Sequence, residues 1–178
     1  EEVVSPYAGE RNIDLLIVGA SPDAAAVREG LRVGSSGWAD PRHEVTLSGA
    51  VSAIASSMPD CVLLGLDLPD SVGMATLEAV VEAAPDAAVI TTGVDDDRLG
   101  RESVLAGAQD YLVKGSDDAE LLVRSVTYAV ARKLSERKAR DAELRFASAL
   151  QASQAHFAAL IECSSDVLLV VDASGTIS

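Results

Sequence analysis

The chain has 178 residues, of which 48% are hydrophobic and only 3% aromatic, so its core must be built mainly from alanine, valine and leucine. Its length predicts one domain of about 120 residues with an appendage. The formal net charge of −14 argues against nucleic acid or an anionic membrane as a direct partner. Because neither a long apolar run nor a signal peptide is present, we expect a cytoplasmic protein with no membrane span.

Four short runs of mainly apolar residues predict β-strands at residues 14–18, 61–66, 88–92 and 110–113, and an alternating run predicts a strand at residues 43–47. Helices are predicted between these strands, at residues 24–32, 49–57 and 71–84 and in a segment that ends at 106, with a long final helix from about residue 117. Residues 1–11 read as a polar leader, and residues 33–42 read as a loop rich in glycine, serine and proline. Strands that alternate with helices predict an α/β fold with a doubly wound, five-stranded parallel sheet.

Cysteine and histidine give no sign of a metal or catalytic centre. Cys61 and Cys163 lie far apart in the sequence, and we interpret both as reduced, structural thiols. His43 and His156 are isolated from other ligand-type residues. We therefore expect no metal and no cofactor.

Four segments carry a resemblance to a known family: LLIVGASP, VLLGLDLPDSVGM, VITTG and GAQDYLVKG. Their order and spacing resemble a CheY-like receiver domain of two-component signalling, with a flavodoxin-like fold, over residues 12–131. In that family an acidic pair after the first strand binds Mg²⁺, and an aspartate at the end of the third strand accepts a phosphoryl group. A threonine or serine follows the fourth strand, and a lysine follows the fifth.

The carboxylate positions of this family are vacant here. The resemblance places the acidic pair on Gly19 and Ala20 and the phosphoacceptor on Gly65, whereas the switch positions keep side chains of the expected kind: Thr92, Tyr111 and Lys114. Phosphoryl transfer to a receiver needs a carboxylate nucleophile and a cation held by oxygen ligands. Because glycine and alanine supply neither, we expect a pseudo-receiver with no enzymatic activity.

Other carboxylates nearby leave alternatives open. Asp67 follows Gly65 by two residues and could form an ion pair with Lys114 or accept phosphate in its place, but we expect it to face water. Asp70 and the aspartates at 95–97 are interpreted as N-caps and first-turn charges of the helices that follow them.

Two further hypotheses concern the pocket itself. The emptied space around Gly19, Gly65, Thr92 and Lys114 could serve a sensor of small ligands or anions. A dinucleotide site is less well supported. The dinucleotide fingerprint requires further glycines after the first, whereas here Gly19 is followed by Pro22 and Asp23.

The final helix should pack on the sheet through Leu121, Leu122, Val126 and Val130 and then continue, since no proline or glycine occurs between Ala131 and Gly175. Two heptad series with a phase slip between them favour a parallel coiled coil over residues 132–162, and so a homodimer. A helix that folds back on its own domain is the alternative. The residues expected on the dimer helix are Val130, Leu134, Leu144, Ala147, Leu150, Phe157 and Ile161.

Residues 163–178 resemble the opening of a PAS sensory domain, which suggests that the chain is the amino-terminal piece of a longer signalling protein. By family analogy, the expected outputs are a histidine kinase, the GGDEF/EAL domains of cyclic-di-GMP turnover, or a transcription-regulating domain. We therefore expect a phosphorylation-independent module that regulates and dimerises a multidomain prokaryotic signalling protein.

Overall fold

The computed structural model describes residues 12–20, 24–25, 27–29, 38, 40–114 and 119–163, with side chains up to residue 158. The predicted leader, most of the predicted loop at 33–42 and the PAS-like segment after residue 163 lie outside the described residues. The chain divides into two units, Glu1–Ser135 and Glu136–Ser178, which are treated separately below.

The first unit contains the predicted parallel sheet. Five strands pair in the order β2-β1-β3-β6-β7, all of them parallel. Their bounds are β1 Leu15–Val18, β2 Arg42–Glu44, β3 Cys61–Gly65, β6 Ala88–Gly93 and β7 Asp110–Val113. The α/β fold class and the five-stranded parallel sheet are thus confirmed.

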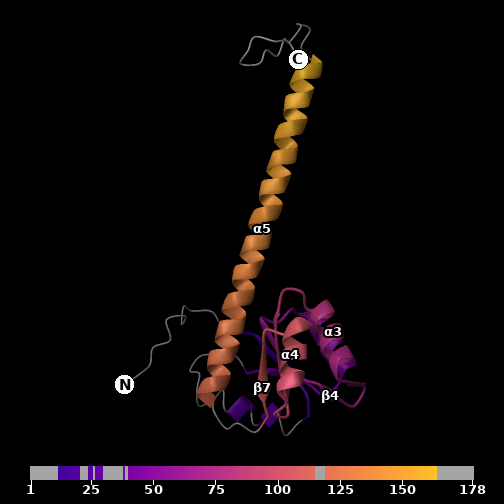
Figure 1. Cartoon of the computed structure of the whole chain (residues 1–178), viewed down its shortest axis with the longest axis vertical. Coiled ribbons are helices and arrows are strands. Elements are labelled where there is room, and N and C mark those ends of the chain that lie inside the picture. The colour runs from indigo at the N-terminus through magenta and orange to yellow at the C-terminus, as the bar shows by residue number, and fades with distance from the viewer. Residues whose placement is uncertain are drawn as a thin grey trace, which may run out of the picture. The chain divides into compact units, whose positions relative to one another are not determined.

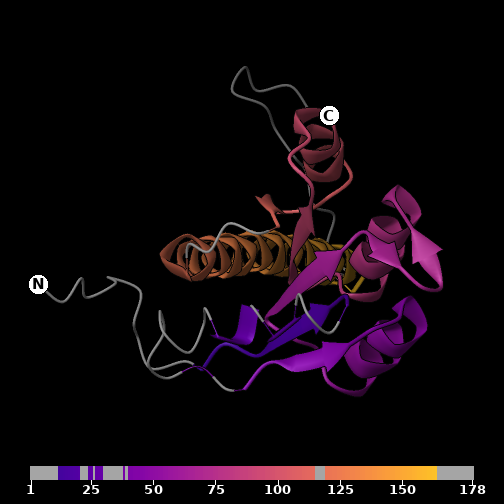
Figure 2. The same ribbon diagram turned by 90° about the horizontal axis from the view of Figure 1, so that it is seen from below.

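Helices cover both faces of this sheet. The described helices are α2 Leu47–Ser56, α3 Met74–Ala83, α4 Asp97–Leu105 and α5 Ala119–Cys163, and residues 24–25 and 27–29 are also helical. The two views agree that the first part of α5 lies on one side of the sheet and that α2 and α3 lie on the other (Figures 1 and 2).

The two hydrophobic cores follow from the alternation of side chains along each strand. Leu16, Val62 and Val89 point to the face that packs against α2 and α3. Leu63 and its neighbours on the other face pack against α5, where Val126 is fully buried; the remaining strand residues in this core are Leu15, Ile17, Cys61, Ala88 and Ile90. Every central strand is therefore covered twice, as its nearly continuous apolar sequence predicts.

Two predicted element boundaries are wrong. The strand predicted at 43–47 ends at Glu44, because the Thr46 side chain accepts a hydrogen bond from the Gly49 amide and so starts α2 at Leu47. The helix predicted at 71–84 begins only at Met74. Residues 67–68 (β4) and 71–72 (β5) instead form a short antiparallel hairpin.

Asp70 caps a different helix from the one predicted. Its carboxylate accepts hydrogen bonds from the amides of Leu47 (2.7 Å) and Ser48 (3.0 Å), at the start of α2. These bonds lower the pKa of Asp70 below its ordinary value. Helix α3 starts after Gly73, at φ +74°, without any side-chain cap. By contrast, Asp96 caps α4 as predicted, through the amides of Arg98 and Leu99.

The second unit consists, in its described part, of the remainder of α5. Between residues 136 and 158 every side chain except that of Arg137 is exposed. None of the described helices combines the length and apolar character needed to cross a membrane.

Candidate functional site

The predicted site residues gather at one edge of the sheet. Gly19 and Ala20 follow β1, Gly65 ends β3, and Lys114 follows β7. The register places Gly65 opposite Thr92 on β6. Because these strands are parallel, their carboxyl ends meet at the same edge, where ligand sites of such sheets occur.

Gly65 lies close to the end of the Lys114 side chain. A Cβ atom added at Gly65 would lie 3.3 Å from the Val18 carbonyl oxygen, 3.7 Å from the Gly19 Cα and 3.9 Å from the Lys114 Nζ. A Cβ atom added at Gly19 would meet nothing within 4 Å. The first atom of a side chain at position 65 would thus lie near the Lys114 ammonium, and position 19 has room for a side chain.

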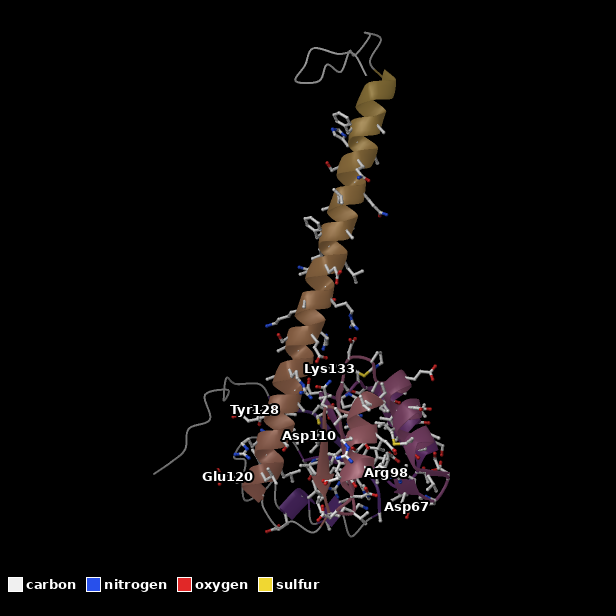
Figure 3. All side chains as sticks on the ribbon, viewed as in Figure 1. Asp67, Arg98, Asp110, Glu120, Tyr128 and Lys133 are labelled. Carbon is white, nitrogen blue, oxygen red and sulfur yellow. The ribbon has the colours of Figure 1, made fainter. Side chains whose placement is uncertain are left out.

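The residues at this edge do not fit a divalent cation. Mg²⁺ requires oxygen ligands, chiefly carboxylates, and the side chains of Gly19, Ala20 and Gly65 contain no oxygen. No group of three acidic, histidine or cysteine side chains suited to a metal occurs in the described part of the chain. Asp67 is exposed on β4, as expected, and forms no ion pair with a described residue (Figure 3).

Tyr111 lies in a slot that requires a glycine at position 93. A Cβ atom at Gly93 would overlap the tyrosine Oη, whereas one at Gly100 would make an ordinary van der Waals contact with its Cδ1, at 3.4 Å. The phenol donates a 2.7 Å hydrogen bond to the carbonyl oxygen of Val94, in the loop before α4. Burial, and then the charges of Asp96 and its neighbour Asp95, raises the pKa of Tyr111.

The hydrogen bond of the Thr92 side chain is longer than that of Tyr111. Its hydroxyl donates to the Leu64 carbonyl oxygen at 3.5 Å, the long limit for such a bond. The backbone amide of Lys114 donates to Gly93 at 2.7 Å, which fixes the chain at the end of β7.

His43 has a role that the sequence did not indicate. Its Nε2 lies 2.9 Å from the Gly19 carbonyl oxygen, and the Gly19 amide donates to the Glu44 carbonyl oxygen at 2.9 Å. Strand β2 therefore holds the backbone of Gly19, directly after β1. Only the parallel pairing of β1 with β2, which places Ile17 opposite His43, brings these residues together.

The structural interpretation of Cys61 is confirmed. Its side chain is fully buried on β3, and burial, together with the charge of Asp60, raises the pKa of the thiol. The side chain of Cys163 lies outside the described part.

The predicted dimer-helix residues fall into two groups. Val130 packs against the core of its own domain, as do Leu122 and Val126, whereas Leu121 is not part of that core. The other side chains that are described along this series are exposed: Leu134, Leu144, Ala147, Leu150 and Phe157. The side chain of Ile161 lies outside the described part.

Comparison with known proteins shows which family and which relatives this chain is similar to. A family model for the response regulator receiver domain matches residues 42–125. The chain is 34% identical over 125 residues to a protein-glutamate methylesterase/protein-glutamine glutaminase of group 2 operon from Cereibacter sphaeroides, a match over 65% of this chain and 32% of that protein. It is 38% identical over 90 residues to the regulatory protein LuxO of Vibrio cholerae, over 50% of this chain and 19% of that protein. The chain thus spans a third or less of the length of these relatives.

Solved structures show the same fold. NtrX from Brucella abortus superimposes with a TM-score of 0.64 at 21% identity, covering 74% of this chain and 29% of that one. A CheY-like response regulator receiver domain protein from Methanospirillum hungatei superimposes with a TM-score of 0.61 at 20% identity, covering 71% of this chain and 99% of that one.

Proposed function

We propose that this chain contains a response regulator receiver domain of a two-component signalling protein, whose family model matches residues 42–125, and that the domain works without being phosphorylated. The proposal rests on one observation, namely that the sheet edge offers Gly19, Ala20 and Gly65 where phosphorylatable receivers have carboxylates. Without a nucleophile at position 65, no aspartyl phosphate forms there. The domain is then a regulatory module and not an enzyme.

We further propose that the module forms a homodimer through α5. The supporting observation is the series of exposed apolar side chains on α5, of which Leu144 is 63%, Leu150 is 51% and Phe157 is 66% exposed. Apolar side chains at heptad spacing on a helix of 45 residues favour a parallel coiled coil. Such a helix would connect the receiver to the PAS-like segment and to an output domain, for which a histidine kinase, a GGDEF/EAL pair or a transcription-regulating domain are the candidates.

The test is phosphorylation by acetyl phosphate with Mg²⁺, followed by intact mass. We expect the wild-type chain to gain no phosphoryl group. The variant Gly19→Asp/Ala20→Asp/Gly65→Asp supplies the missing carboxylates and serves as the positive control. A stable adduct on the wild-type chain would contradict the proposal, and its loss in Asp67→Asn would assign the adduct to Asp67.

A second candidate function is a sensor of small anions. The 3.9 Å separation between a Cβ atom at Gly65 and the Lys114 Nζ favours it, because a small carboxylate could occupy the place of the missing side chain. Titration with acetate or inorganic phosphate should then raise the melting temperature of the wild-type chain but not that of Lys114→Ala. Equal shifts in both chains would exclude this site.

A further inference from the structure

Arg132 of α5 is hydrogen-bonded to Gln109, which lies in the connection between α4 and β7. Its Nε donates to the side-chain oxygen of Gln109, and its Nη2 donates to the backbone carbonyl oxygen of the same residue. The next residues along the chain, Lys133 and Asp110, are labelled in Figure 3. A guanidinium that donates two hydrogen bonds to one residue fixes the geometry of the contact more narrowly than a single bond would. The contact therefore joins α5 firmly to the α4–β7 connection.

Arg132 stands close to the point where α5 leaves the core of its domain. Val126 is fully buried and Val130 is half-buried, and both pack in the core on this face of the sheet. Arg132 itself is exposed, and the first unit of the chain ends at Ser135. Apolar packing thus holds α5 up to Val130, and the two hydrogen bonds of Arg132 extend this attachment beyond the core.

Gln109 is itself held by both the sheet and α4. Its amide donates a 2.6 Å hydrogen bond to the carbonyl oxygen of Val89, on β6. The amide of Ala108, directly before it, donates a 3.0 Å hydrogen bond to the carbonyl oxygen of Ser103, on α4. A displacement of α4 would therefore move Ala108 and then Gln109, and so would act on the bonds of Arg132.

The described placement of α4 leaves a buried hydroxyl unsatisfied. Ser103 is fully buried, and its Oγ has no hydrogen-bond partner among the described residues. The two residues after it face solvent, Val104 at 50% and Leu105 at 88% exposure. An unpaired buried hydroxyl costs free energy, and exposed apolar side chains contribute no burial. Helix α4 therefore loses less by moving than a helix with a fully apolar buried face would.

We propose that the contact between Gln109 and Arg132 couples the placement of α4 to α5 at the point where α5 leaves the core. The inference goes beyond the proposed loss of phosphorylation and does not require the proposed homodimer. With α4 in the described placement, Gln109 accepts both bonds and residues 131–135 stay fixed as helix. When α4 moves, Gln109 moves with it, so Arg132 loses its bonds and this part of α5 opens more often. By linkage, release of Arg132 loosens the α4–β7 connection in turn.

Amide hydrogen exchange in the 178-residue chain, followed by NMR, tests this coupling. We expect Arg132→Ala to raise the exchange rates about tenfold at residues 131–135 and also at Ala108 and Gln109. Because alanine is the best helix former, a loss of helix propensity cannot produce the first effect. Arg124→Ala makes the same change at another exposed position of α5 and should leave both sets of rates unchanged. Faster exchange in α5 alone would show that Arg132 supports only its own helix and would overturn the proposal.

Ser103→Ala tests the coupling from the side of α4. It removes the unsatisfied hydroxyl, so it should stabilise the described placement of α4 and slow exchange at residues 131–135 about threefold while Arg132 is present. In an Arg132→Ala background the same change should leave these rates unaffected, because the connection is cut. Rates are compared after correction for any change in the urea midpoint. Equal slowing in both backgrounds, or none in either, would contradict the coupling.

Discussion

At the scale of single residues, this receiver depends on glycines at places where side chains would change its behaviour. Gly65 and Gly19 bring no side chain to the carboxyl ends of β3 and β1, whereas Gly93 leaves room for the ring of Tyr111. The absence of side chains at positions 19 and 65 can be read directly from the sequence. The tyrosine slot cannot, because it depends on how β6, β7 and α4 approach one another.

Gly93→Ala should displace Tyr111. The added Cβ atom would lie 2.3 Å from the phenol oxygen, so either the ring or the loop at Val94 must move. We expect a loss of about 1–3 kcal/mol in the free energy of unfolding, measured by urea denaturation. In a Tyr111→Ala background the same glycine change should cost much less, and an equal cost in both backgrounds would show that the slot does not constrain the ring.

Asp70→Asn should destabilise the domain in a pH-dependent way. The amides of Ser48 and Leu47 stabilise the charged carboxylate in the folded state, which lowers its pKa. The stabilisation is therefore complete above the ordinary carboxyl pKa of about 4 and is lost as the pH falls through the lowered value.

Urea denaturation of wild type and Asp70→Asn should thus differ at pH 7 and converge in acid. Asp67→Asn is the matched control, because Asp67 is an exposed aspartate of the same hairpin without these hydrogen bonds. A gap between wild type and Asp70→Asn that stays constant with pH would contradict this account.

At the scale of elements, four of the five strands could be predicted because each is a short, mainly apolar run bounded by turn residues. Strand β2 consists of the polar residues Arg42–Glu44, and the apolar residues that suggested a strand at 43–47 lie after it. The β4–β5 hairpin could not be predicted, because Ser71 and Val72 precede a helical sequence and their pairing with Asp67 and Leu68 requires the turn between them. The exposure of Val104 and Leu105 could not be predicted for a related reason. Val104 and Leu105 are apolar residues of a helix, and only the orientation of α4 shows that they face outward.

Leu77→Ala should test the core beneath α3. Leu77 is fully buried and packs in the core formed with α2. Its truncation leaves a cavity, so we expect a loss of about 2–5 kcal/mol in the free energy of unfolding. Glu78→Ala, an exposed change on the same helix, should stay within about 0.5 kcal/mol of wild type. Similar losses in both variants would mean that α3 contributes through helix propensity and not through burial.

At the scale of the whole molecule, the open question is what covers the exposed apolar side chains of α5. Heptad spacing alone predicts a partner helix but leaves its geometry undetermined, because Arg137 and Asp141 interrupt the series. Along the described part of α5, most of the cations precede Leu144, and the exposed apolar side chains of Phe146, Leu150 and Phe157 follow it.

Leu150→Asp/Phe157→Asp should convert the proposed dimer into a monomer. In the proposed coiled coil each substitution would place a carboxylate in an apolar seam beside the same residue of the other copy, so desolvation and like-charge repulsion add. Both positions are exposed in the single chain, so the fold of the receiver should not change, and the midpoint of its unfolding in urea reports this.

Ala152→Asp adds a charge to the same helix away from the seam and should leave sedimentation unchanged. A wild-type chain that sediments as a monomer at all concentrations would show that α5 does not pair, and a dimer that survives both substitutions would place its interface elsewhere.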